Sequence, residues 1–247
     1  MRTAVIIHVF HYKHWKELAY CAKNFSFFNP DIFITVSSNL SDENIEEIRS
    51  NLPSAELQIV QNRGFDVGPF VKVINEIELF KYDLIVKLHT KRNRFGIVNY
   101  MPFFGNQWRK KLLSFCSSQK RTLQTVEIFQ KNPQVGMIGA GELIIKEDGY
   151  FIGGTMFVAR ASLFTNLSER VGFDDFEITK RNQTNSLAHS WERRLGYLVA
   201  EKGMAIHGFP PASPLLVYTY PLRKFLYEII VFFPRLLRKF YEAKHCR

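Results

Sequence analysis

Cysteine is scarce in this sequence. Cys21, Cys116 and Cys246 are the cysteines among its 247 residues, and they lie far apart without a CxxC pair. Disulfide frameworks and zinc clusters need several closely spaced cysteines. The sequence therefore supports neither, and it fits a reducing compartment.

Long apolar runs are missing as well. No stretch reaches the ~18 uninterrupted apolar residues that a transmembrane helix needs. The opening MRTAVIIHVF holds one cation and a short apolar run, without a small-residue cleavage site. We therefore interpret it as a first strand and not as a signal peptide.

Several catalytic and nucleotide-binding signatures are also absent. The sequence contains no GxGxxG, no GKS or GKT, no GxSxG and no HExxH. A dinucleotide fingerprint, a P-loop, an esterase-type hydrolase and a zinc peptidase consequently have little support.

Positive charge, in contrast, is abundant. The chain has 33 Lys and Arg against 23 Asp and Glu, which gives a net charge of +10 and a pI near 9.5. The basic residues gather in three separate segments, 87–94, 108–121 and 223–247. Because these do not join into one stripe and no nucleic-acid-binding motif is present, phosphorylated substrates or anionic lipid fit the charge better than nucleic acid.

The first ninety residues alternate between apolar runs of strand length and helical patterns. Strands are predicted at 3–10, 31–37, 56–62 and 82–90, with helices at 13–25, 41–52 and 68–80. This alternation predicts an α/β fold, a Rossmann-like and mostly parallel sheet flanked by helices. Ligands of such sheets bind at the carboxyl ends of the strands, where His8, His11 and Ser37 would lie with the segments NRGFDVG and HTKR.

The second half is less regular. Helices are expected at 105–118, 123–132 and 185–203, and short strands at 135–141, 153–160 and 204–209. No low-complexity linker separates the halves, so we expect one domain over residues 1–215.

Residues 216–247 have a different pattern. One apolar face, with Arg and Lys between its members, is formed by Leu222, Phe225, Leu226, Ile229, Ile230 and Phe233. A basic amphipathic helix of this kind is typical of a membrane surface. The alternative is a terminal helix that packs on its own domain or on a second subunit.

The most distinctive stretch is QNRGFDVGPF, residues 61–70, in which two glycines flank an aspartate between a strand and a helix. Glycine permits a tight turn and close approach of a ligand. Asp66 can accept hydrogen bonds from sugar or base groups, and Arg63 can fork onto a phosphate. The alternative is a structural turn in which Asp66 caps the helix and Arg63 is solvated.

The segment KLHTKR, residues 87–92, ends the fourth strand with charge but without an acid. A metal-dependent nucleotide enzyme would place carboxylates here to hold a divalent cation. Instead, Lys87, Lys91 and Arg92 can neutralise a diphosphate directly, and His89 can donate to a phosphate oxygen or act as an acid. The alternative is a basic loop that keeps an edge soluble.

Two further segments combine residue types that suit a ligand site. In FIGGTMFVAR, Gly153 and Gly154 precede a strand, so their N–H groups can face a ligand, unless they form a bulge or a hairpin turn. In AHSWERR, His189 and Glu192 share one side of a helix, where a carboxylate with a nearby histidine can take a hydroxyl proton. The alternative is a surface cluster of Glu192 with the two arginines that follow it.

The order of these motifs resembles the rhamnan synthesis F family of bacterial polysaccharide assembly, over about residues 4–210. The resemblance is carried by IIHVFHYKHWKEL, NRGFDVGPF, YDLIVKLHTKR, GGTMFVAR and LAHSWERRLGYLV. The combination of N-R-G-x-D-x-G-P-F with K-x-H-T-K is specific. It implies a glycosyltransferase with a GT-A-like fold and a nucleotide-sugar donor.

The patterns and the resemblance together give a set of candidate residues. The catalytic candidates are Glu192, His189 and His89. The donor-binding candidates are Asn62, Arg63, Gly64, Asp66, Gly68, Lys87, Thr90, Lys91, Arg92, Gly153, Gly154 and Thr155. KLHT stands where related enzymes have a D-x-D metal motif, and their E-D pair is missing, so no metal ligand and no cofactor besides the donor is assigned.

The expected activity is the transfer of a sugar, with rhamnose as the expected sugar, to a growing cell-surface polysaccharide or lipopolysaccharide in a single inverting displacement. The expected partners are the nucleotide-sugar, a lipid-linked glycan acceptor and, through the tail, the inner face of the cytoplasmic membrane. The alternative is a non-catalytic sugar- or phosphate-binding module, or a scaffold, of a polysaccharide assembly complex.

Overall fold

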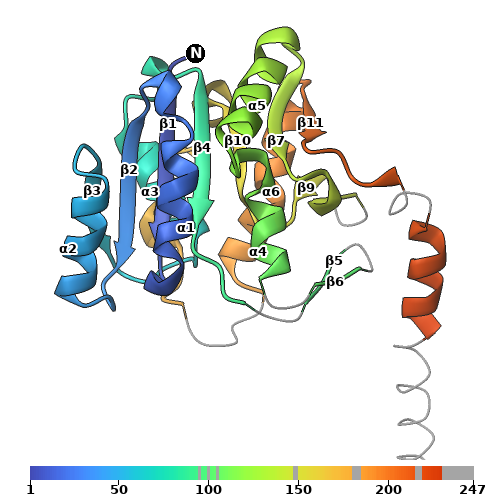
Figure 1. The fold of residues 1–247 in the computed structure, drawn as a ribbon, viewed down its shortest axis with the longest axis horizontal. Helices are drawn as coiled ribbons and strands as arrows, with labels where there is room; N and C mark the ends of the chain where they lie inside the picture. Colours follow the sequence, from blue (N-terminus) through green and yellow to red (C-terminus); the bar gives the residue numbers. More distant parts are fainter. Residues whose placement is uncertain are drawn as a thin grey trace, which may run out of the picture.

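The centre of the fold is a single mixed sheet. The structure, a computed structural model, describes residues 1–93, 96–98, 101–103, 106–146, 150–179, 185–214 and 219–229. Within them the main strands are β1 (Thr3–Val9), β2 (Asp31–Ser37), β3 (Glu56–Val60), β4 (Leu84–His89), β7 (Val135–Gly139), β10 (Phe157–Arg160) and β11 (Ala205–Gly208). They lie in the order β11-β7-β10-β4-β1-β2-β3 (Figure 1).

Helices cover both faces of this sheet. Alternate residues of β1 point to opposite faces. Val5, Ile7 and Val9 pack in one core with α1 (Trp15–Lys23), α2 (Asp42–Asn51), α4 (Gln107–Leu112) and α5 (Gln119–Lys131). Ala4 and Ile6 pack in the other core with α3 (Val67–Glu76) and α6 (Leu187–Glu201). The expected mostly parallel α/β sheet flanked by helices is thus confirmed.

Two small hairpins and several single turns complete the described part of the chain. The hairpins pair β5 (Gly96–Val98) with β6 (Met101–Phe103), and β8 (Ile144–Ile145) with β9 (Phe151–Ile152). The 3-10 turns span Tyr12–His14, Ser26–Phe28, Leu79–Lys81, Ser114–Cys116, Gly141–Leu143, Ala161–Phe164 and Phe173–Asp175.

Local sequence signals explain most boundaries. The side chain of Ser41 accepts a hydrogen bond from the N–H of Asn44 and caps α2, as a serine before an acidic first turn predicts. Several predicted elements are longer than the observed ones. The helix expected at 105–118 is divided into α4 and a 3-10 turn, and the strand expected at 153–160 begins only at Phe157, after a turn at Gly153 and Gly154.

The C-terminal tail is described only in part. Residues 220–229 are helical, and Leu222, Phe225, Leu226 and Ile229 are exposed. Residues 216–218 and 230–247 lie outside the described residues, so the expected tail and its boundary after residue 215 stay predictions. In the part of the chain that the structure describes, no helix is long and apolar enough to cross a membrane.

The direction of β10 decides what can meet at the edge of the sheet. Every pairing in the sheet is parallel except those of β10, which is antiparallel to β4 and to β7. The loop before β10 therefore lies at the same edge as the ends of β1, β2, β3, β4, β7 and β11. We call this the carboxyl edge, and α3 and α6 also begin there.

Candidate active site

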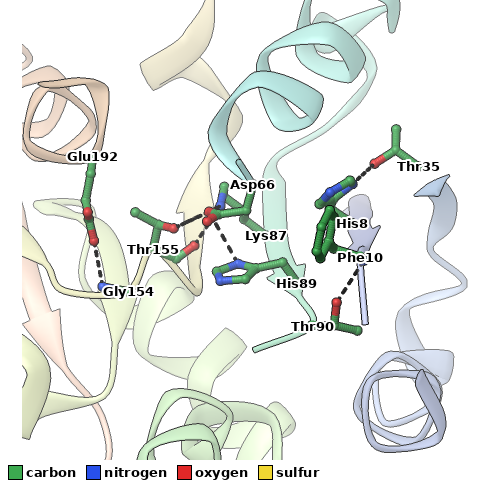
Figure 2. Close-up of polar contacts among 10 residues, drawn as sticks. All are labelled: His8, Phe10, Thr35, Asp66, Lys87, His89, Thr90, Gly154, Thr155 and Glu192. Carbon is green, nitrogen blue, oxygen red and sulfur yellow. Dashed lines mark hydrogen bonds and ion pairs between the residues drawn. The ribbon is translucent and has the colours of Figure 1, made fainter. Parts of the chain in front are cut away.

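Three segments meet around the ammonium group of Lys87 at the carboxyl edge (Figure 2). Lys87 Nζ donates to Asp66 Oδ2 at 2.5 Å and to the Oγ1 and the carbonyl oxygen of Thr155, both at 3.0 Å. Thr155 Oγ1 itself donates to Asp66 Oδ2 at 2.5 Å. An ammonium group has three protons, and each has an acceptor here. Lys87 therefore joins the end of β4, the start of α3 and the loop before β10.

Strand alternation places these groups. Val86 and Leu88 of β4 enter the core with α1, so Lys87 and His89 face the side of α3 and α6. Asp66 precedes α3 at its N-cap but makes no capping hydrogen bond, and its Oδ2 accepts hydrogen bonds from Lys87 and Thr155 instead. The interpretation of Asp66 as a helix cap is therefore wrong.

Lys87 and Asp66 form an ion pair that is largely removed from water. Lys87 is 1% exposed and Asp66 is 16% exposed. Burial would raise the pKa of Asp66, but His89 and the Lys87 ammonium hold it well below its usual range. Burial lowers the pKa of Lys87, and the Asp66 carboxylate opposes that lowering. Each charge thus depends on the other to stay ionised away from water.

Two histidines stand side by side next to this pair. His8 of β1 and His89 of β4 are register partners, and they are 4% and 2% exposed. Burial lowers the pKa of His8 to about 4 and that of His89 well below its usual range, so both rings are neutral at pH 7. His8 Nδ1 lies 3.0 Å from Thr35 Oγ1, and His89 Nδ1 lies 3.4 Å from Asp66 Oδ2. The Nε2 atoms of both rings are buried without a hydrogen-bond partner among the described residues.

These neutral histidines predict a pH dependence of stability. The unfolded chain protonates His8 below its ordinary pKa of about 6.5, whereas the folded chain does so only near 4. Between these values the unfolded state binds more protons, so the free energy of unfolding falls as the pH falls, by on the order of 3 kcal/mol. Urea titrations from pH 7 to pH 4 should show a flatter dependence for His8→Gln. The same change at the exposed His207 is the control, and equal slopes for both variants would contradict this assignment.

Glu192 reaches the carboxyl edge from the first part of α6. Its Oε1 accepts the N–H of Gly154 at 2.8 Å (Figure 2). Gly154 has a φ of +82°, a conformation that favours glycine. Among the described residues Glu192 has no ion pair with Arg193 or Arg194, so the surface cluster considered as an alternative is not formed. The structure thus brings Glu192 next to the loop that carries Thr155.

Backbone strain is concentrated around the site. In the part of the chain that the structure describes, the non-glycine residues with positive φ are Asn29, Phe65 (+53°), Thr155 (+51°) and Asn185 (+57°). The last three lie just before α3, β10 and α6, at the carboxyl edge. Such conformations are costly, above all for a β-branched residue such as threonine, and they persist where the surroundings enforce them, often at functional sites.

The NRG part of the distinctive motif binds another segment of the chain. The guanidinium of Arg63 donates to Gln61 Oε1 and to the carbonyl oxygen of Phe176, both at 2.9 Å. The Asn62 carbonyl accepts the N–H of Thr179 at 2.8 Å. A Cβ atom on Gly64, which has a φ of +63°, would lie 2.5 Å from the Phe176 ring. Asn62, Arg63 and Gly64 thus hold residues 176–179 in place, and the half-buried Arg63 is bonded within the chain.

The remaining donor-binding candidates divide into structural and exposed groups. Gly68 leaves room for the carbonyl of Arg63, and Gly153 precedes the Gly154 turn. Thr90 Oγ1 accepts the N–H groups of Phe10 and His11, at 2.9 and 2.8 Å, and so ties the end of β1 to the end of β4. Lys91 is half-buried and Arg92 is exposed, with its Nε donating to His11 Nε2 at 3.0 Å. These two cations, and not Lys87, are the ones available at the surface.

The residues at this edge do not fit a resident divalent cation. Lys87 and His89 offer no carboxylate at the end of β4, and Oδ2 of the nearby Asp66 is bonded to Lys87 and Thr155. Within the described ranges no three His, Cys, Asp or Glu side chains gather in a way that could hold a metal.

Three residues of this site are absent from the candidates drawn from the sequence. His8 was placed at the edge but given no role, although its position at the end of the first strand puts it beside His89. Ser186 bonds His189, with Oγ 2.7 Å from Nδ1. Phe65 packs its ring edge-on against His189, with 5.3 Å between ring centroids. A serine three residues before a histidine at a helix start is the signal that could have revealed Ser186.

The fold and the site define an α/β protein with a polar site at the carboxyl edge of a mostly parallel sheet. Residues 1–146, more than half of the chain, match the family model of rhamnan synthesis protein F. The chain belongs to this family, as the sequence motifs indicated.

The known proteins that resemble this chain in sequence match it at low identity and over a small part of their own length. Protein WxcX of Xanthomonas campestris pv. campestris is 26% identical in strain B100 and 25% identical in strain ATCC 33913, over 175 residues in each case. These stretches cover 60% of this chain and 24% of either WxcX, so the chain matches about a quarter of the length of these relatives.

Two solved structures share a distant likeness. One is described as a "putative nucleotide-diphospho-sugar transferase" from Desulfovibrio desulfuricans G20, at 10% identity and a TM-score of 0.39 over 85% of this chain and 80% of that one. The other is core-mannan synthase A of Aspergillus fumigatus in a Mn/GDP form, at 12% identity and a TM-score of 0.36 over 85% and 77%. Likenesses this distant add nothing to the assignment of the site.

Proposed function

We propose that this chain is a glycosyltransferase that uses a nucleotide-sugar donor to extend a cell-surface polysaccharide or lipopolysaccharide. The observation that supports this best is the meeting of Glu192, held by the N–H of Gly154, with the strained Thr155 and the pair of Lys87 and Asp66 at one edge of the sheet. Membership of a rhamnan synthesis family supports a polysaccharide as the product and rhamnose as the sugar.

The proposed reaction is a single inverting displacement. Glu192 takes the proton of the acceptor hydroxyl, and the hydroxyl oxygen forms a bond with the anomeric carbon of the donor. The bond between that carbon and the diphosphate oxygen breaks, and the nucleoside diphosphate leaves with the electron pair. A carboxylate oriented by a backbone N–H group is suited to this task because its geometry is fixed before the substrate arrives.

Cations at the end of β4 stabilise the departing diphosphate in this proposal. Lys91 and Arg92 come just after Thr90 at the end of β4 and are not part of the buried pair. Preorganised positive charge next to a leaving group that gains negative charge lowers the barrier of the reaction. Lys87 has another role here: it positions Asp66 and Thr155, which line the edge where the donor sugar would bind.

A donor panel tests the proposed activity. Purified protein is incubated with individual nucleotide-sugars, and the release of nucleoside diphosphate is measured with and without EDTA. We expect release with one donor class, and we expect EDTA to leave the rate within about twofold, because this proposal assigns the stabilisation of the diphosphate to cationic side chains and not to a metal. Loss of release in EDTA would contradict the metal-free mechanism. Absence of release with every donor, together with absence of nucleoside diphosphate binding, would favour the alternative of a non-catalytic binding or scaffold module.

The exposed face of the tail supports a lipid-linked acceptor at the inner face of the cytoplasmic membrane. Leu222, Phe225, Leu226 and Ile229 are each between 41% and 59% exposed, and Arg223 and Lys224 lie between the first two of them in the sequence. Apolar side chains on a basic helix enter the boundary of an anionic lipid surface, so in this proposal the tail tethers the chain to the membrane.

Liposome binding tests this tether. The double substitution Phe225→Asp and Leu226→Asp should lower co-sedimentation of the full chain with anionic liposomes by about tenfold or more, since it removes the apolar contact and adds repulsion. The control is Phe80→Asp, which changes a phenylalanine that is 82% exposed outside the tail. Equal binding of both variants and the parent chain would reject the tether.

A further inference from the structure

The ring of His189 is held more firmly than that of an ordinary surface histidine. Its Nδ1 lies 2.7 Å from Ser186 Oγ, and its ring packs edge-on against Phe65. Phe65 and Asn185, the residue before Ser186, both have positive φ. Two strained backbone positions thus flank this one imidazole, which is half-buried at the start of α6.

Ser186 gives up its usual role to make this contact. It occupies the N-cap of α6, where a serine side chain ordinarily accepts a backbone N–H from the first turn. Here its side chain makes no capping hydrogen bond, and its hydroxyl lies against His189 instead. The residue is 3% exposed, so water does not compete for the hydroxyl.

The surroundings of Ser186 determine which ring nitrogen of His189 carries the proton. A hydroxyl has one hydrogen to donate, and in the described part of the chain Ser186 Oγ has no hydrogen-bond partner other than His189 Nδ1. If Nδ1–H donated to Oγ, the hydroxyl hydrogen would be left buried and unpaired, which is costly. If the hydroxyl donates to Nδ1, both groups are satisfied. The proton of the neutral ring is then on Nε2.

We propose that Ser186 is a positioning residue that fixes His189 as the Nε2–H tautomer, so that His189 donates a hydrogen bond to an oxygen of the donor diphosphate. This inference rests on the proposed function, and it adds a role for His189 to it. His189 has no lone pair to offer at Nε2 and does not take the acceptor proton. Glu192 alone is the base, and His189 joins Lys91 and Arg92 in stabilising negative charge on the leaving group.

The tautomer is measured without any substrate. Full-length protein with ¹⁵N-labelled histidine is studied at pH 8, above the ordinary histidine pKa of about 6.5, by two-bond ¹H–¹⁵N correlation, with His189→Gln to assign the signals. We expect a protonated Nε2 in the parent chain and a mixture of tautomers in Ser186→Ala. The control, Ser190→Ala, changes an exposed serine on the same helix and should leave the signals unchanged. A protonated Nδ1 in the parent chain would overturn the inference.

The donor role is measured by binding. Glutamine places an amide N–H near the position of Nε2–H, whereas leucine has no donor. We expect His189→Gln to bind nucleoside diphosphate within about threefold of the parent chain and His189→Leu to bind about tenfold more weakly, a loss typical of one hydrogen bond to a charged group. Equal losses in both variants would overturn the donor role. If the parent chain binds no nucleoside diphosphate, the proposed function and the diphosphate contact fail together, while the Ser186 assignment is still judged by the tautomer.

Discussion

Glu192→Gln is expected to lower kcat by about 10²- to 10⁴-fold, the usual contribution of a general base. Glutamine keeps a side-chain oxygen that can accept the N–H of Gly154, the hydrogen bond that Glu192 makes at 2.8 Å. The loop before β10 should therefore keep its place, and only the ability to accept the acceptor proton is lost. The measurement is the rate of nucleoside diphosphate release at saturating donor and acceptor.

The matched control is Glu201→Gln. Glu201 lies at the other end of α6, where it pairs with Arg170 on the surface. This change should leave kcat within about twofold, because exposed ion pairs contribute little. If Glu192→Gln kept full activity while its thermal stability matched the parent chain, Glu192 would not be the base.

Lys87→Met should destabilise the fold strongly. The change leaves the carboxylate of Asp66 near the neutral His89 without its cation, and removing one partner of a buried pair typically costs about 3–5 kcal/mol. It also removes the hydrogen bonds that hold Thr155 in its positive-φ conformation. Urea unfolding monitored by circular dichroism measures the loss. Activity should fall with it, since the loop that positions Glu192 is released.

A double variant distinguishes the effect of leaving Asp66 unpaired from the effect of losing the lysine side chain itself. Adding Asp66→Asn to Lys87→Met removes the stranded charge and should recover part of the stability. The control is Lys81→Met, which breaks the exposed pair of Lys81 and Glu78 and should cost at most about 1 kcal/mol. If Lys87→Met cost no more than Lys81→Met, the buried pair would not hold the three segments together.

The fold was readable in the sequence to the extent that local signals determine it. The strands and helices of the first ninety residues follow from apolar spacing, a serine cap and proline, which act over a few residues. The carboxyl edge followed as well, because parallel strands bring their ends together. Asp66, Lys87, His89 and Glu192 were therefore gathered at one edge before their contacts were known.

The partners of these residues could not be read in the same way. Thr155 is 68 residues from Lys87, and Phe176 is 113 residues from Arg63. No local sequence pattern predicts that an antiparallel strand, β10, pairs with β4 and brings Thr155 to the ammonium group of Lys87. The sequence therefore suggested a lysine that meets the substrate, whereas the folded chain encloses that lysine.

The position of β10 in the sheet also determines which fragment of this chain could be expressed alone or transferred to another protein. The family match ends at residue 146, but β10 lies beyond that point and separates β4 from β7 in the sheet. A fragment that ended at residue 146 would lack β10, so one edge of β4 would be unpaired and Lys87 and Asp66 would be exposed to solvent. An unpaired strand edge promotes aggregation. Relatives such as WxcX are far longer than the matched stretch. In this chain, a fragment that keeps the sheet intact must therefore extend at least through β11, which ends at Gly208.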